Sequence, residues 1–428
     1  MSNHHVSNKR QQLQQKLNNR DKTICLTMIV KNESINMIRV LDSVKPIIDY
    51  LSIVDTGSTD NTVEVIEHWY KQHKIPGKVH HEPFKNFGYN RTHSMQMAKK
   101  TWPQANYYLL SDADFVWQID KEFNKKLLFV DKYLVVQQHH DLVYSNIRML
   151  SGKFDWICHG VTHEYWEEDK NSTKGVEVTS HTLTSLRIDD KEDGNFKHHK
   201  YPRDRCLLEN GLKDETISDD LRIRYHFYLA QTYKCMRDFD LAIEFYIKRS
   251  NMAGWQEETY YAMYQTGICY QALYNVYKSI SHFYDKEQKE DCEIELINKY
   301  AKDLTLEDIK NKEKSSVDSA IEWYLKAWKF RPTRAEALYQ AVAIYREIGQ
   351  HQLAYDYAMI GKDIEFPTDS LFIEASAYSW AFYYEISIVA YYLNKKQEGS
   401  EACLFVLEQD DVPAHLLKKV EENCKFYI

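Results

Sequence analysis

The chain has 428 residues, a length typical of two or three domains rather than of one compact core. Hydrophobic residues make up 43% of it and charged residues 28%, which describes a globular protein and not a disordered one. The 55 basic and 63 acidic side chains give a net charge of -8, which disfavours a protein whose main task is to grip nucleic acid. With only 13 Gly and 8 Pro, long regular elements are expected, many of them helices.

The cysteines and the apolar runs indicate in which cellular compartment the protein is expected. Eight cysteines are scattered along the chain without a C-x-x-C pair, which favours a reducing environment. The polar, Gln- and Asn-rich opening over 1–22 lacks the apolar core of a signal peptide. The apolar runs 24–30 and 386–393 are far too short to span a bilayer. The sequence therefore predicts a cytoplasmic protein with no membrane span and no nucleic-acid partner.

After the polar arm, predicted strands alternate with predicted helices. This alternation implies a mostly parallel α/β sheet, in which ligands bind beyond the carboxyl ends of the strands. Asp55, Asp112 and Asp114 fall at such ends. The expected strands are 23–30, 50–55, 79–84 and 107–117, the last breaking at acidic residues, and the expected helices are 33–48, 61–73 and 90–101.

From about Asp219 onward the alternation stops and every segment has helical periodicity. The predicted organisation is a polar arm over 1–22, an α/β domain over 23–215 and an all-α tetratricopeptide-like repeat domain over 216–428. The Lys- and Glu-rich segment 275–316 fits the repeats poorly and is a candidate insertion. Small residues recur twelve positions apart, as in helix pairs that pack closely: Ala230 and Ala242, Gly267 and Ser279, Val342 and Ala354, Ala390 and Ala402.

The acidic segment SDADFVW follows the fourth predicted strand. Two carboxylates two positions apart, Asp112 and Asp114, can bind a divalent cation that neutralises a diphosphate leaving group. The same spacing recurs at Asp238 and Asp240 inside a helical repeat, so the D-x-D pair alone is equally compatible with turn or cap aspartates. Its interpretation depends on the motifs around it.

Five motifs occur in a fixed order: MIVKNES, IVDTGSTDNT, FGYNRT, SDAD and HGVTHE. In this order they resemble an inverting family 2 glycosyltransferase with the GT-A fold, over roughly Thr23 to Cys206. Together with tetratricopeptide-like helices they further resemble sublancin-type peptide S-glycosyltransferases, which share a D-A-D, an H-G-x-x-H-E and a C-terminal helical repeat domain. The resemblance implies a Rossmann-like GT-A sheet, a UDP-sugar donor with Mn²⁺ or Mg²⁺, and dimerisation through the repeats.

The resemblance also assigns contacts to the nucleotide. It implies that Asp55 binds uracil, whereas the residues alone also allow Asp55 merely to fix the turn before Gly57. Thr27, Ile29 and Glu33 line the end of the first strand, where the family places base and ribose.

Three basic residues are candidates for contacting the diphosphate of the donor. Asp112 and its cation would contact the same diphosphate. Arg91 suits a phosphate or a base carbonyl, with a surface arginine near a helix start as the alternative. In this chain Tyr89-Asn90-Arg91 stands where many family members have Ala-Arg-Asn. Lys200 and Arg203 lie where the family often has a basic residue, although a basic interdomain linker explains them equally well.

The segment HGVTHEYWE supplies the candidate base. Inversion at an anomeric carbon needs a carboxylate that takes the acceptor's proton, and Glu164 is the candidate. His163 is expected to complete the metal shell or to contact the diphosphate, and zinc is disfavoured because no zinc motif or third ligand is present. The rival bases are Glu167, Glu168 and Asp169, and the aromatic residues that could stack on a sugar or belong to the core are Trp117, Tyr165 and Trp166.

The sequence thus predicts a metal-dependent inverting glycosyltransferase. It would move a sugar from a UDP-sugar to a hydroxyl or thiol on a peptide, protein or glycan. The resemblance implies a homodimer through the helical domain, whereas the residues alone leave the oligomeric state open. The alternative is a tetratricopeptide scaffold with a noncatalytic nucleotide-sugar-binding domain, which the retained Asp55, Asp112, Asp114 and Glu164 disfavour. A nucleotidyltransferase would need a Gly-rich phosphate loop, and TMIVKNES has no glycine.

Overall fold

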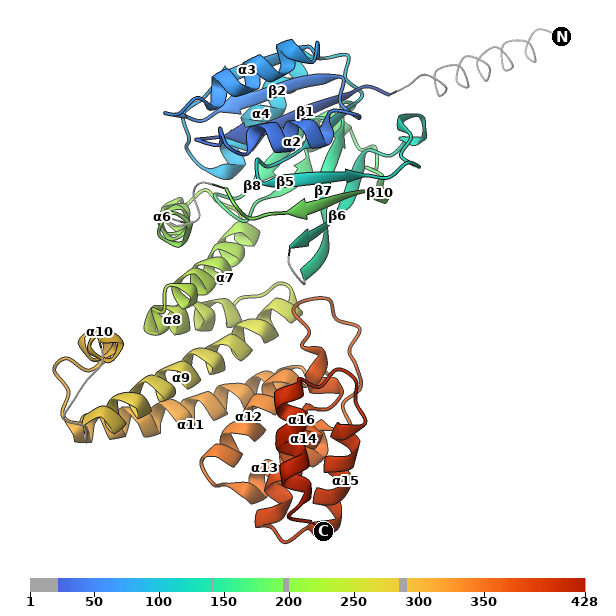
Figure 1. Cartoon of the computed structure of the whole chain (residues 1–428). Coiled ribbons are helices and arrows are strands. Elements are labelled where there is room, and N and C mark those ends of the chain that lie inside the picture. Colours follow the sequence, from blue (N-terminus) through green and yellow to red (C-terminus); the bar gives the residue numbers. More distant parts are fainter. Residues whose placement is uncertain (1–21, 140–141, 195–199, 285–290, 428) are drawn as a thin grey trace. The chain divides into compact units, whose positions relative to one another are not determined.

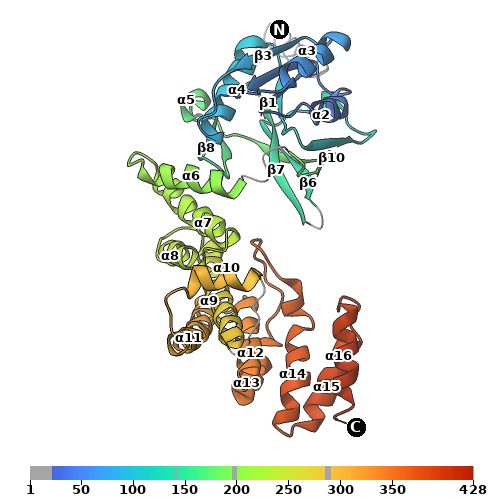
Figure 2. The ribbon, with the colours of Figure 1, turned by 60° about the vertical axis from the view of Figure 1, so that its left-hand side comes forward.

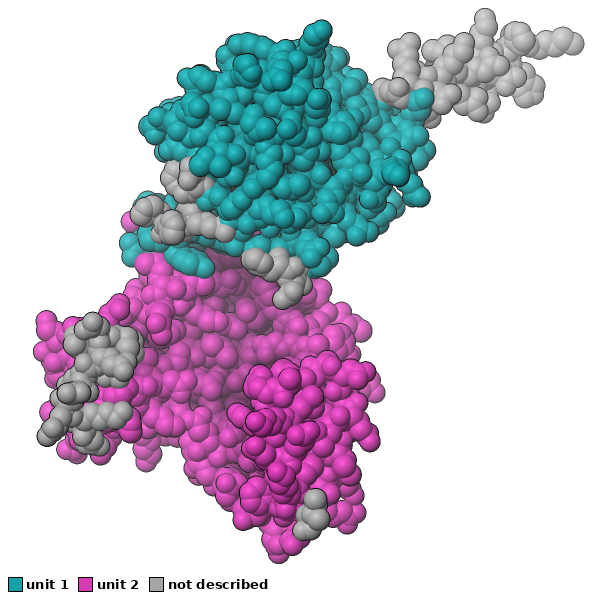
Figure 3. Space-filling model, viewed as in Figure 1, with its two compact units in different colours: residues 1–211 teal, residues 212–428 magenta. Residues whose placement is uncertain are grey.

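The computed structural model describes residues 22–139, 142–194, 200–284 and 291–427 (Figure 1). The chain divides into two compact units, residues 1–211 and 212–428 (Figure 3). The predicted polar arm lies outside the described residues, except for Lys22.

The first unit is built around an eight-stranded sheet with the strand order β3-β2-β1-β4-β7-β6-β10-β5. Four of its strand pairings are parallel and three are antiparallel, which confirms the expected mostly parallel α/β sheet. A separate two-stranded sheet pairs β8 with β9. The strands are β1 (Ile24–Val30), β2 (Tyr50–Asp55), β3 (Gly77–His81), β4 (Tyr107–Leu110), β5 (Phe115–Ile119), β6 (Lys132–His139), β7 (Leu142–Ser151), β8 (Trp156–His159), β9 (Tyr165–Glu168) and β10 (Ser180–Asp190).

Helices cover both faces of the parallel part of the sheet. Ile24 and Leu26 of β1 join the core under α2 and α3, whereas Cys25 joins Met95 and Ala98 of α4 on the other face. Burial on both faces explains why β1 is a continuous apolar run. The helices of this unit are α2 (Met37–Val44), α3 (Thr62–Gln72), α4 (Phe87–Thr101), the short α5 (Lys170–Thr173) and α6 (Lys200–Lys213), which extends past the boundary between the units.

The acidic segment does not interrupt one strand, as the sequence suggested, but joins two distant ones. β4 ends at Leu110 in the middle of the sheet, and β5 begins at Phe115 at its end. Trp117 of β5 is only 4% exposed and donates its indole N–H to Ser111 Oγ at 3.0 Å. Trp117 is therefore a core residue and is not placed to stack on a sugar.

The second unit is helical, and its consecutive helices pack side by side, α7 on α8, α12 on α13 and α14 on α15 (Figure 2). None of the described helices combines the length and the apolar character needed to cross a membrane. The helices are α7 (Asp219–Cys235), α8 (Phe239–Ser250), α9 (Gln256–Tyr284), α10 (Asp291–Tyr300), α11 (Leu306–Phe330), α12 (Glu336–Glu347), α13 (His351–Gly361), α14 (Ala381–Tyr392), α15 (Lys396–Leu407) and α16 (Ala414–Cys424), with the 3-10 turn η3 (Ala375–Tyr378).

The small residues mark most of the helix contacts. Three of the four predicted pairs lie on adjacent helices and are buried, which confirms the tetratricopeptide-like pairing: Ala230 and Ala242, Val342 and Ala354, Ala390 and Ala402. The pairing of Gly267 with Ser279 is wrong, because both lie within the single helix α9. Gly267 instead faces Tyr324 of α11. Part of the candidate insertion 275–316 lies outside the described residues, so that assignment stays a prediction.

The contact of Gly267 with Tyr324 gives a test of the α9 and α11 packing. A Cβ at Gly267 would lie 2.5 Å from the Tyr324 ring, which is fully buried. We expect Gly267→Ala to lower the free energy of unfolding by about 1–3 kcal/mol, because the overpacking outweighs the gain in helix propensity. Urea unfolding measures this difference, and Asn275→Ala, at an exposed position of α9, is the control. Equal stability of Gly267→Ala and the wild type would contradict the packing.

Candidate active site

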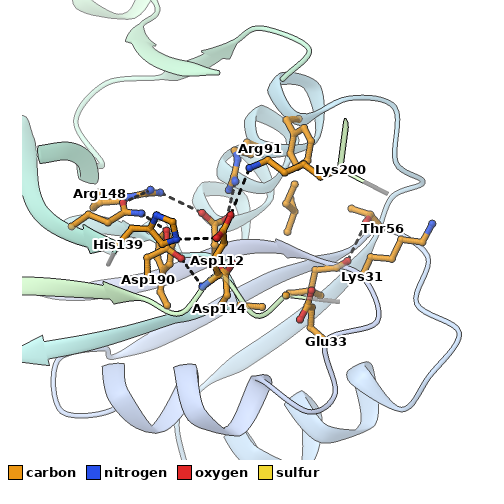
Figure 4. Close-up of a pocket in the computed structure, with 18 of the residues that line it drawn as sticks. Lys31, Glu33, Thr56, Arg91, Asp112, Asp114, His139, Arg148, Asp190 and Lys200 are labelled. Atoms are coloured by element: carbon orange, nitrogen blue, oxygen red, sulfur yellow. Dashed lines mark hydrogen bonds and ion pairs between the residues drawn. The ribbon is translucent and has the colours of Figure 1, made fainter. Parts of the chain in front are cut away.

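A pocket of about 880 Å³ lies in the first unit, beyond the carboxyl ends of the central strands (Figure 4). Side chains from β1, α4, the acidic segment, β6, β7, β10 and α6 line it. The structure therefore brings together residues that are far apart in the sequence. The predicted site residues that line this pocket are Ile29, Glu33, Arg91, Asp112, Asp114, Lys200 and Arg203.

Thr27 and Glu164 line a second pocket, of about 100 Å³, which shares Arg91 and Asp112 with the first. The Thr27 hydroxyl lies 2.7 Å from Ser94 Oγ and is buried. Glu164 thus lines the smaller pocket and not the larger one, whereas Arg91 lines both.

Asp55 and His163 line neither pocket. The Asp55 carboxylate is buried and accepts hydrogen bonds from the backbone N–H groups of Gly57 and Ser58, at 3.2 and 3.1 Å. With this geometry Asp55 fixes the turn. The contact of Asp55 with uracil stays a prediction. His163 has a left-handed backbone with φ of 50°, and its role toward a metal or diphosphate also stays a prediction.

Arg91 lies at the centre of the site. Its Nη2 contacts Asp112 Oδ1 at 2.7 Å, and its Nε donates to Glu164 Oε1 at 2.7 Å. The Arg91 side chain is only 15% exposed, so the interpretation as a surface arginine is wrong. Burial acts to lower the pKa of Arg91, but Asp112 and Glu164 outweigh it and raise the pKa above its usual value.

The loop between β8 and β9 carries Glu164 and is fixed to the start of α4. The backbone N–H of Phe87 donates to Val161 O at 3.1 Å, and that of Gly88 donates to Gly160 O at 2.9 Å. The loop thereby satisfies donors that a helix start leaves without partners. A Cβ at Gly88 would lie 2.5 Å from Gly160 O, so only glycine allows this approach. Backbone contacts thus hold Glu164 near Arg91.

A second arginine reaches Asp112 from β7. Arg148 Nη1 lies 3.5 Å from Asp112 Oδ2, while its Nη2 donates to Gln137 Oε1 at 2.7 Å. Gln137 in turn donates to Asp190 Oδ2 at 2.8 Å. Figure 4 shows Arg91 and Arg148 meeting Asp112 from two sides. Burial acts to raise the pKa of Asp112, but the two arginines lower it below its usual range.

Sequence reasoning missed Arg148, Gln137 and Asp190, together with His139 and Glu192, which also line the pocket. A signal for Arg148 and Gln137 was available, because each is a polar residue within a largely apolar strand, IRML and LVVQ. The register that places β6 beside β7 and β10 beside β6 could not be read from these segments.

The charged groups with the largest effect on Asp114 are other carboxylates. Burial, Asp112 and Asp190 raise the pKa of Asp114 to about 7. Within the described parts of the chain, no cluster of three or more His, Cys, Asp or Glu side chains has the geometry of a metal site. The metal roles of Asp112, Asp114 and His163 therefore stay predictions.

The two predicted basic residues of α6 reach the same pocket. Lys200 Nζ lies 3.8 Å from Glu192, whose carboxylate is in turn 2.9 Å from His139 Nε2. Arg203 pairs with Asp204 at 2.9 Å and lies over the Phe87 ring at 4.8 Å. These cations line the pocket, whereas their contact with a diphosphate stays a prediction.

The raised pKa of Asp114 predicts a pH-dependent cost in stability. The unfolded chain titrates near 3.8 at this position and the folded chain near 7, so the folded state binds the proton more tightly and loses stability as pH rises between these values. We therefore expect Asp114→Asn to be more stable than the wild type at pH 8 in EDTA. Its free energy of unfolding should be higher by at least about 1 kcal/mol. The difference should shrink toward pH 4.

Urea unfolding at both pH values measures this effect, with Asp120→Asn, at an exposed position, as the control. A stability difference that is independent of pH would contradict the assigned titration.

Comparisons with known proteins place this geometry in a family. The model of glycosyl transferase family 2 matches residues 25–148. No curated protein matches the chain. The matched range includes Arg91, Asp112, Asp114 and Arg148, whereas Glu164, Lys200 and Arg203 lie beyond it.

Three solved structures illustrate the likenesses of the two units. A tetratricopeptide (TPR) protein of Thermus thermophilus is 14% identical, with 53% of this chain and 92% of that chain covered and a TM-score of 0.31. S. aureus TarS in complex with UDP is 13% identical, with 71% and 91% covered and a TM-score of 0.28. The human IFIT1 dimer with m7Gppp-AAAA is 15% identical, with 51% of this chain and 40% of that chain covered and a TM-score of 0.34.

TM-scores of this size are too low to support an argument, so the family match and the geometry carry the assignment. The match begins in β1 and ends in β7, and so covers the parallel core of the sheet and the acidic segment. The first unit of this chain carries a family 2 glycosyltransferase domain.

Proposed function

We propose that this chain is an inverting, metal-dependent glycosyltransferase that moves a sugar from a UDP-sugar to an acceptor hydroxyl or thiol. One observation carries the proposal: in the unit that contains the family 2 match, cations and carboxylates converge in one pocket of about 880 Å³ beyond the strand ends. A nucleoside diphosphate donor needs cations for its phosphates and a negatively charged site for a bridging cation. Besides Arg91, whose guanidinium is already paired with two carboxylates, the pocket-lining groups of these two kinds are Arg148, Lys200, Arg203, Asp112 and Asp114.

We assign the base and ribose to the end of the pocket formed by Ile29, Glu33 and Thr56, near the ends of β1 and β2. Asp55 supports this end by fixing the turn that follows Thr56. The diphosphate then falls between the acidic segment and the cations of α6, Lys200 and Arg203. These two side chains are 43% and 30% exposed, so they can reorient toward a phosphate.

The residues present fit a divalent cation at Asp114 better than at Asp112. Both Asp112 oxygens already face arginines, whereas Asp114 lies among carboxylates that raise its pKa. A cation beside Asp114 would relieve this repulsion, and carboxylate and phosphate oxygens are the ligands that Mg²⁺ and Mn²⁺ prefer. When bound, the cation would neutralise charge that develops on the departing phosphate.

Glu164 is the base in this proposal. The acceptor oxygen or sulfur bonds to the anomeric carbon, the bond from that carbon to the phosphate oxygen breaks with its electron pair leaving on UDP, and the acceptor's proton passes to Glu164. The rivals are less well placed, because neither pocket is lined by Glu167, Glu168 or Asp169. Asp169 instead accepts from the backbone N–H of Asn171 at 2.9 Å.

The setting of the reaction belongs to the same proposal. Every cysteine whose side chain the structure describes is a free thiol, which fits the cytoplasm. We propose that the helical unit presents a peptide, protein or glycan acceptor, or joins two copies of the chain. The alternative for the whole chain is a tetratricopeptide scaffold with a noncatalytic nucleotide-sugar-binding domain. Such a scaffold would show no turnover.

The test is UDP release from a panel of UDP-sugars, with Mn²⁺ or Mg²⁺ and with EDTA. We expect at least one donor to release UDP, slowly with water and faster with the acceptor. Binding of UDP without release from any donor would instead support the noncatalytic scaffold.

Removing the Asp114 carboxylate should abolish transfer. Asp114→Ala leaves the developing phosphate charge without its cation, and we expect turnover to fall by roughly 10²-fold or more. Asp112→Ala should also inactivate the enzyme but act less directly, because Asp112 is held by arginines. UDP release with and without EDTA measures both effects. Full wild-type activity in EDTA would rule out the metal role.

Replacing the base should separate chemistry from binding. Glu164→Gln keeps the shape but cannot accept the proton, so we expect turnover to fall roughly 10²-fold or more with UDP-sugar affinity nearly unchanged. Steady-state kinetics and calorimetric UDP binding measure the two quantities. The matched control is Glu167→Gln, at an exposed position three residues away. A greater loss in the control would make Glu167 the base.

A further inference from the structure

We infer that Arg91 is a positioning residue: one guanidinium fixes the proposed base Glu164 relative to Asp112 of the acidic segment. This inference rests on the proposed function. It assigns Arg91 a role different from the donor contact that the family likeness implies, and it accounts for the position of Arg91 between the two pockets.

The geometry couples two carboxylates through one rigid group. The Arg91 Nε and Nη2 atoms belong to the same planar guanidinium, and each lies 2.7 Å from a different carboxylate, Glu164 and Asp112. A planar fork with fixed donor directions sets the orientation of both partners, which an ammonium on a flexible stem cannot do. Moving either carboxylate therefore disturbs the other.

The backbone reinforces this coupling. Arg91 lies on the first turns of α4, and the Phe87 and Gly88 N–H groups of the same helix hold the loop that carries Glu164. The loop is thus attached to α4 twice, by backbone bonds and by the buried ion pair of Glu164 with Arg91. The three paired side chains are only 15%, 24% and 17% exposed, so water screens these contacts weakly.

The pairing also leaves Glu164 able to act. Arg91 engages Glu164 Oε1, and among the described residues no hydrogen bond to Oε2 is found, so Oε2 is the oxygen left for the acceptor's proton. Arg91 itself has two carboxylate partners, whereas Lys200 and Arg203 are more exposed and better suited to a phosphate. A guanidinium that holds one carboxylate oxygen orients the base without taking its place.

The test uses Arg91→Ala and Arg91→Lys in the full chain. We expect kcat for transfer to fall by roughly 10²-fold, with the Kd for UDP within about threefold of the wild type. Guanidinium ions should restore the kcat of Arg91→Ala by at least about tenfold, because they refill the vacated site. Ammonium ions at the same ionic strength should not. Arg187→Ala, at an exposed position of β10, is the matched control and should behave as the wild type.

A double-mutant cycle with Glu164→Gln tests whether Arg91 acts through the base. If it does, Arg91→Ala should cost less than about threefold in kcat once Glu164 is already glutamine. Additive losses would overturn the inference, as would a loss of UDP affinity with unchanged kcat, which would make Arg91 a donor ligand. If Arg91→Ala fails to fold, kcat, the Kd for UDP and the double-mutant cycle are measured with Arg91→Lys and Arg91→Gln instead. Failure of the proposed function is seen separately, as no turnover in the wild type.

Discussion

The first unit depends on how it accommodates negative charge at the carboxyl ends of its strands. Asp112 lies there with Asp114 and Asp190, and Arg91 links Asp112 to Glu164, which lines the smaller pocket. Burial and neighbouring like charges raise the pKa of a carboxyl group, whereas nearby cations lower it. Arg91 and Arg148 provide positive charge from α4 and β7, and both of them contact Asp112.

The arginines compensate the negative charge of Asp112 but not that of Asp114, and this difference has a chemical consequence. Asp112 faces two arginines and has a lowered pKa, whereas the pKa of Asp114, two residues later, is raised to about 7. The difference arises because the chain turns between β4 and β5 and directs the two carboxylates to different neighbours. Uncompensated negative charge lowers the stability of the folded protein. Such charge is typical of functional sites, where a bound ligand supplies the positive charge.

The local features of the sequence predicted the parts of the site that local chemistry determines. The apolar runs of β1, β2 and β4 can be read from the sequence, and so can the acidic segment, as the polar continuation of β4. Arg148 and Gln137 were not found, because their place depends on the register of β7 against β6 and of β6 against β10. The pairing of Gly267 with Ser279 failed for a related reason: spacing cannot show whether a helix ends between two small residues.

The helical unit shows that a buried charge network alone does not make a site. There, Arg334 and Glu336 are fully buried and paired at 3.0 Å, and Glu336 also accepts hydrogen bonds from Tyr260 and Tyr378 at 3.1 and 2.9 Å. Arg334 further pairs with Asp369 at 3.3 Å. This network joins α9, α12 and η3 with its polar groups satisfied within the protein, as a structural network must be. The network at Asp112 differs because it lines a pocket and because Asp114 beside it is left among like charges, so it has both the space and the electrostatic need for a ligand.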